Sequence, residues 1–110
     1  MSQAKIAFLI LSEDPARAIP GLVMAQRLKQ NRDDEVRVLF FGRGVYLAAS
    51  GAVDEQIKAL ADAGVLPRAC RANVEQYGVQ EAIAARQLEL IAAGAEVEEF
   101  HHLGYTVLSF

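Results

Sequence analysis

Two stretches of this chain are apolar at almost every position, and they restrict the possible folds more than any other feature. They are KIAFLIL, residues 5–11, and VRVLFF, residues 36–41. Neither alternates between apolar and polar residues as a strand with one solvated face would. A strand that is apolar on both faces is typical of a parallel sheet covered by helices on both sides. We therefore expect both segments to be strands inside such a sheet.

Three shorter segments also have strand character, and helical patterns separate all five. The further strands are expected at residues 65–70, 88–91 and 105–110. Helices are expected from the loop at 12–21 to about Gln30, and at 45–50, 54–63, 73–78, 80–86 and 92–104. Such alternation predicts an α/β protein, a three-layer α/β/α sandwich with a mainly parallel five-stranded sheet. The length of 110 residues is typical of one domain, which we place at 1–110.

Signals at the helix ends refine these boundaries. Pro20 is expected in the first turn of its helix, where a missing N–H costs nothing. Asn73 is followed three residues later by Gln76, which resembles a capping box, so a helix is expected to begin at Asn73 and to stop at Gly78.

The last helix has an apolar side and an acidic side in the sequence. Val97, Phe100 and Leu103 are expected to point inward. Glu96, Glu98 and Glu99 are then most simply a solvated face of the same helix.

Composition argues against two classes of partner. The net charge is −3 and the basic residues form no long run, so a nucleic-acid-binding surface is not expected. The apolar run near the N-terminus is too short for a signal peptide or a membrane span. We expect a cytoplasmic protein that does not bind membranes.

The chain contains one cysteine, Cys70, within the stretch PRACRANVEQYG. One cysteine excludes an internal disulfide, a CxxC redox pair and a multi-cysteine zinc site. Cys70 is expected where a strand passes into a helix, and the helix N-terminus together with Arg68 and Arg71 would favour the thiolate. Arg68 should share a strand face with Cys70. The alternative is a small buried side chain that only packs, because free cysteines are often buried.

Other candidate sites are weaker. Gly42–Val45 is expected to be a plain tight turn, although Arg43 in this turn could reach an anion at the sheet edge, and Tyr46 lies close to it. The adjacent His101 and His102 point about 100° apart on a helix, so no metal site is expected. No cofactor is expected either. The acidic residues after the first strand suggest a receiver domain, but Cys70 stands where a receiver needs an aspartate.

The order and spacing of these segments resemble the DsrE/DsrF-like family, which includes YchN-type proteins. The resemblance covers nearly the whole chain and is carried by KIAFLIL, VRVLFFGRGVYL, RACRANVEQYGV and LELIAAGAEVEEFHHLGYTVLSF. It implies an α/β sandwich that assembles as trimers or hexamers. In the sulfur-relay members, the cysteine at the position of Cys70 accepts sulfane sulfur as a persulfide and passes it on.

Three hypotheses follow for Cys70. In the first, it carries sulfur between donor and acceptor proteins, and Arg68, Arg71, Arg43 and Tyr46 surround the anionic persulfide. In the second, the protein is a non-catalytic oligomeric binding module in which the cysteine only packs. In the third, Cys70 is a redox sensor, which a reducing cytoplasm disfavours.

Overall fold

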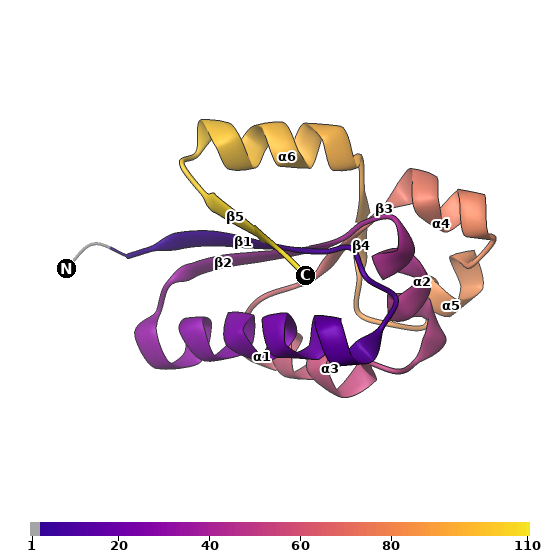
Figure 1. Ribbon diagram of the computed structural model, residues 1–110, viewed down its shortest axis with the longest axis horizontal. Helices are drawn as coiled ribbons and strands as arrows, with labels where there is room; N and C mark the ends of the chain where they lie inside the picture. Colours follow the sequence, from indigo (N-terminus) through magenta and orange to yellow (C-terminus); the bar gives the residue numbers. More distant parts are fainter. Residues whose placement is uncertain (1–2) are drawn as a thin grey trace.

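The computed structural model describes residues 3–110, which form a three-layer α/β/α sandwich (Figure 1). The strands are β1 (Lys5–Ile10), β2 (Glu35–Phe40), β3 (Arg68–Cys70), β4 (Glu89–Ile91) and β5 (Thr106–Ser109). The helices are α1 (Pro15–Arg32), α2 (Arg43–Ser50), α3 (Asp54–Asp62), α4 (Arg71–Tyr77), α5 (Gln80–Ala84) and α6 (Ala93–His102). Helix α6 lies on one face of the sheet, α1 and α3 lie on the other, and α2, α4 and α5 gather beyond the carboxyl ends of the strands (Figure 1). The predicted fold class is confirmed.

The sheet is parallel throughout, in the order β4-β3-β2-β1-β5. The chain builds outward from β1 to β4, and β5 then returns to the free side of β1. Leu9 is aligned with Leu39, and Leu39 with Arg68. Aligned residues of parallel strands point to the same face, so this row shares its face with Cys70, two residues after Arg68. That face is the one that α6 covers.

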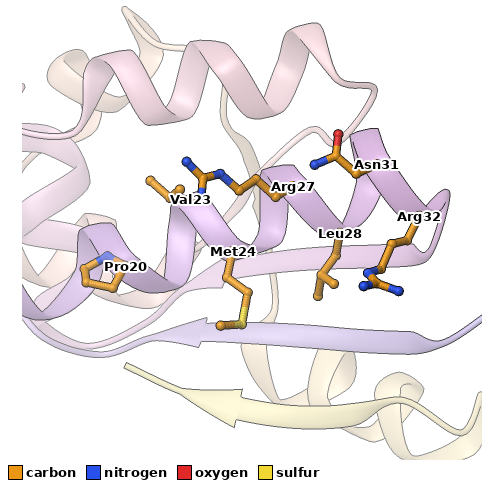
Figure 2. A pocket seen from close by; sticks show the side chains of 7 residues that line it. All are labelled: Pro20, Val23, Met24, Arg27, Leu28, Asn31 and Arg32. Carbon is orange, nitrogen blue, oxygen red and sulfur yellow. The ribbon is translucent and has the colours of Figure 1, made fainter.

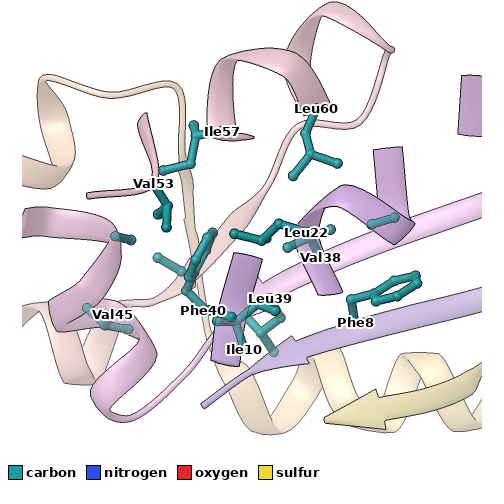
Figure 3. Close-up of a cluster of buried hydrophobic side chains, with 14 of the residues drawn as sticks. Phe8, Ile10, Leu22, Val38, Leu39, Phe40, Val45, Val53, Ile57 and Leu60 are labelled. Carbon is teal, nitrogen blue, oxygen red and sulfur yellow. The ribbon is translucent and has the colours of Figure 1, made fainter. Parts of the chain in front are cut away.

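The opposite face, under α1 and α3, carries much of the hydrophobic core (Figure 3). Its large buried side chains are Phe8, Ile10, Leu22, Val38, Phe40 and Leu60. Burying each of them stabilises the fold by roughly 1.5–3 kcal/mol. Helix α1 packs closely against Phe110 because Gly21 has no side chain. A Cβ at this position would lie only 2.6 Å from the ring of Phe110. That ring stacks on Phe8 with 5.8 Å between the centroids.

Helix α1 begins earlier than the prolines suggested. The Asp14 side chain accepts a hydrogen bond from the backbone N–H of Ala16 at 2.9 Å, and Pro15 is the first helical residue. Pro20 therefore lies inside the helix, and the prediction that it occupies the first turn is wrong. The N-terminal cap determines where the helix starts, and the helix tolerates the one hydrogen bond that Pro20 cannot donate.

Strand β3 is shorter than predicted. The segment 65–70 was expected to be extended and paired, but the strand begins only at Arg68. Pro67 has no N–H to donate to a neighbouring strand, and pairing with β2 starts directly after it, where Arg68 aligns with Leu39. The other strand and helix boundaries agree within one or two residues, except where described.

The segment after β2 is more helical than predicted. A tight turn was expected over 42–45, but α2 already begins at Arg43. A Cβ at Gly44 would overlap the carbonyl oxygen of Ile10. The missing side chain of Gly44 therefore lets α2 start against the end of β1, which positions Arg43 and Tyr46 at the carboxyl edge of the sheet.

Candidate functional site at the carboxyl end of the sheet

Cys70 is the last residue of β3, and α4 begins at the next residue. The capping box predicted at Asn73 is therefore wrong, because Cys70 itself occupies the N-cap position. The Asn73 side chain instead accepts a hydrogen bond from the Gly42 N–H at 2.8 Å and donates one to Gln76 at 3.1 Å. The first of these bonds ties α4 to the loop after β2.

The thiol of Cys70 lines an open cleft of about 450 Å³. The other lining residues are Phe41, Arg71, Ala72, Glu75, Ala92, Ala93 and Gly94. Cys70 is only 4% exposed, so it lies at the base of this cleft with little of its side chain accessible. The walls come from α4, the start of α6 and Phe41 after β2, and they are mainly apolar with one guanidinium and one carboxylate.

Of the two arginines that flank Cys70 in the sequence, only Arg71 lines this cleft. Its side chain is exposed, and Nη2 donates a long hydrogen bond of 3.4 Å to the carbonyl oxygen of Leu90. Among residues 3–110, no carboxylate lies within ion-pairing distance of Arg71, so its positive charge can act on an anion bound beside the thiol.

Arg68 has a different environment. Its Nη1 donates to both carboxylate oxygens of Glu96, at 2.7 and 2.6 Å. Arg37 Nη1 donates to the same carboxylate at 3.1 Å, and Arg68 also lies 3.8 Å from Glu89. Burial lowers the pKa of Arg37, but Tyr105 and the neighbouring glutamates more than compensate and raise it above its usual value. Arg68 thus belongs to an ionic cluster around the buried carboxylate of Glu96, and this cluster joins α6 to the sheet.

This cluster corrects the predicted orientation of α6. Glu96 was assigned to a solvated face but is 5% exposed, whereas Val97 and Leu103, predicted to point inward, are 42% and 41% exposed. Only Phe100 is buried as expected. The helix turns its face with Ala93 and Glu96 toward the sheet because the arginines on β2 and β3 need a counter-charge where they are half-buried. Two arginines in otherwise apolar strands were the sequence signal for a buried carboxylate.

Arg43 and Tyr46 form a second group at the same end of the sheet. The Arg43 guanidinium lies 4.5 Å from the ring centroid of Tyr46 and 5.1 Å from that of Tyr77. Glu13, in the loop after β1, binds it with two hydrogen bonds, at 3.2 and 2.7 Å. The hydrogen bond from Arg43 lowers the pKa of Glu13 below its usual range. Glu13, in the loop after β1, and Tyr77, at the end of α4, are far from Arg43 in the sequence, so no local pattern indicated that they are its partners.

The structure thus divides the five predicted site residues into three groups. Cys70 and Arg71 line one cleft, Arg43 and Tyr46 stack together nearby, and Arg68 is held by a carboxylate of α6. The bond between Asn73 and Gly42 connects the first two groups.

Residues 3–110 also form clefts away from Cys70. A cleft of about 250 Å³ lies along α1, and all its lining residues come from that one helix (Figure 2). Within residues 3–110, no cluster of three or more His, Cys, Asp or Glu side chains is arranged to hold a metal ion. None of the helices in this part of the chain is long and apolar enough to cross a membrane.

Solved structures provide a comparison for this arrangement. The YchN protein of E. coli superposes with a TM-score of 0.78 at 16% identity, covering 98% of this chain and 100% of its own. The chain shares the fold of YchN. A conserved protein of unknown function from Bacteroides thetaiotaomicron gives a TM-score of 0.81 at 20% identity, with 96% of this chain and 95% of that one covered.

A protein of unknown function from Methanobacterium thermoautotrophicum is similar to a comparable degree. Its TM-score is 0.77 at 15% identity, with 98% of this chain and 100% of that one covered. No protein-family model matches the chain, and no curated protein sequence matches it. The comparisons therefore establish the YchN-like fold, and any activity has to be argued from the site.

Proposed function

We propose that this protein carries sulfane sulfur as a persulfide on Cys70 and passes it to a thiol of a partner protein. The observation that supports this most directly is the position of Cys70 at the base of an open cleft with Arg71 in its wall. The cleft lies at the carboxyl end of a parallel sheet, where such folds place their ligands.

The proposed transfer needs no external oxidant or reductant. The Cys70 thiolate attacks the outer sulfur of a donor persulfide, the sulfur–sulfur bond of the donor breaks, and the donor leaves as a thiolate. Cys70 then holds the sulfur as an anionic persulfide. An acceptor thiolate attacks this outer sulfur, and Cys70 leaves as a thiolate, ready for another cycle. Arg71 stabilises the anionic forms through its positive charge. Arg43 and Tyr46, one loop away, would contact the incoming partner.

The partners and the assembly belong to the same proposal. Donor and acceptor are proteins that present a persulfide or a thiol, and the carrier works in the cytoplasm. Self-association to a trimer or hexamer is proposed from the family resemblance. Sedimentation equilibrium tests it directly, because a trimer or hexamer has three or six times the chain mass of 12.0 kDa.

A second candidate is a binding module of the same fold in which the cysteine only packs. The low exposure of Cys70, 4%, is the observation that favours it. In that case the thiol would react with labelling reagents only after global unfolding.

Intact-mass spectrometry distinguishes the two candidates. We expect wild-type protein incubated with polysulfide to gain the mass of one or more sulfur atoms, and a reductant to remove the gain. Cys70→Ser should fold normally and show no gain, because no other thiol is present in the chain. A folded wild-type protein that gains no mass would favour the binding module. A Cys70→Ser variant that loads as well as the wild type would disprove the persulfide carrier.

A further inference from the structure

One buried carboxylate ties the wall of the Cys70 cleft to the strand that carries Cys70. The first turn of α6 contributes Ala93 and Gly94 to the cleft wall. In the same helix, Glu96 accepts two short hydrogen bonds from Arg68, which precedes Cys70 by two residues on β3. The helix that borders the thiol and the strand that bears it are therefore joined directly.

Glu96 is one of the few residues that α6 buries. Of the ten residues of α6, only Ala93, Glu96 and Phe100 are buried. Only 4% of the Glu96 side chain is exposed, and its carboxylate is also bound by Arg37 of β2. An element with so few buried apolar contacts is the kind that opens locally without global unfolding. Removing the buried charge should therefore release α6 before it affects the rest of the fold.

We propose that Glu96 is a positioning residue that holds the first turn of α6 over the Cys70 thiol, and that access to the thiol requires this contact to loosen. The role depends on the proposed function, since it explains how a thiol that is 4% exposed can meet a sulfur donor. The contact between Glu96 and Arg68 that supports this role does not depend on sulfur chemistry. The expected opening is local: α6 would open at its first turn while the core under α1 and α3 stays folded.

The test is the rate at which N-ethylmaleimide modifies Cys70 in the folded full-length chain, followed by mass spectrometry. We expect Glu96→Gln to raise this rate by about tenfold or more, because α6 then opens more often. Glu98→Gln is the matched control: Glu98 lies on the same helix, is exposed and forms no ion pair within residues 3–110, so its rate should equal that of the wild type.

Low concentrations of urea separate local opening from general destabilisation. Local opening exposes little surface, so the faster rate of Glu96→Gln should depend only weakly on urea. A rate that rises with urea as steeply as global unfolding, or a rate equal to that of Glu98→Gln, would overturn the proposal. If Glu96→Gln does not fold, Arg37→Gln provides the same test, because it removes one partner of the carboxylate and should give a smaller acceleration.

Failure of the role of Glu96 can be distinguished from failure of the proposed carrier function. Wild-type protein that loads sulfur while Glu96→Gln reacts no faster than the control would reject the role of Glu96 alone. Faster labelling of Glu96→Gln in a protein that never loads sulfur would reject the carrier function and keep the role of Glu96.

Discussion

Cys70 and Arg71 are neighbours in the sequence but have opposite environments. The thiol belongs to the buried cluster at the end of β3, while the guanidinium is exposed in the wall of the same cleft. Charge near a thiol changes its reactivity through the thiolate, because the positive group favours the ionised form. Exposure to solvent limits the size of this effect.

At the residue scale, we expect Arg71→Gln to slow persulfide loading of Cys70 by about threefold to tenfold at neutral pH. The difference should shrink in high salt, which screens the exposed guanidinium of Arg71. The measurement is the loading rate against salt concentration by intact mass. Arg27→Gln, which changes an exposed arginine of α1, is the control. Equal rates in the two variants would show that Arg71 does not assist the thiol.

At the scale of elements, side chains from separate loops connect the carboxyl ends of neighbouring strands. Glu13 follows β1 and Arg43 opens α2 after β2, and their ion pair joins the two loops. Asn73 of α4 binds the backbone of Gly42. The Cys70 cleft is therefore positioned by polar contacts between loops as well as by the sheet.

The ion pair between Glu13 and Arg43 should make stability depend on pH. The pKa of Glu13 is lowered in the folded state, so its contribution is present at neutral pH and is lost as the pH falls through that lowered pKa. We expect Arg43→Gln to be slightly less stable than wild type in urea denaturation at neutral pH. The difference in stability between the variant and wild type should become smaller at acidic pH and in high salt. If the difference in stability between Arg43→Gln and wild type persists at acidic pH, it comes from the stacking of Arg43 on the tyrosines, because arginine stays charged in acid.

Helix α2 depends on a close backbone approach. A Cβ added at Gly44 would overlap the Ile10 carbonyl oxygen and lie 2.7 Å from the carbonyl carbon, so α2 would have to move away from β1. We expect Gly44→Ala to lower the free energy of unfolding by about 1–3 kcal/mol or more. Gly94→Ala is the matched control, because its Cβ would meet no atom within 4 Å, and it should be neutral or slightly stabilising. Equal stability of both variants in urea denaturation would contradict the close packing at Gly44.

At the scale of the whole molecule, the two faces of the sheet are covered unequally. Helices α1 and α3 cover one face, while α6 alone covers the other (Figure 1). The thinly covered face carries Cys70, the ionic cluster around Glu96, and an apolar groove lined by Leu9, Phe41 and Val97 beside α6. Stability is therefore concentrated on one side of the sheet, and the side that carries the thiol has fewer contacts to lose when it opens.

The sequence by itself determined the fold class, the parallel sheet and the position of Cys70 at a strand end. These follow from short-range patterns: apolar runs without alternation give buried strands, and Gly78 ends α4 as expected because only glycine readily adopts its φ of 64°. Only the tertiary structure decided the strand order, the inward turn of Glu96 and the separation of Arg68 from Arg71. The physical reason is that the side of a helix that faces the sheet depends on the charged side chains that the sheet presents to it. The partners of Glu96 are residues 37 and 68, 59 and 28 positions away along the chain, and no local pattern contains both.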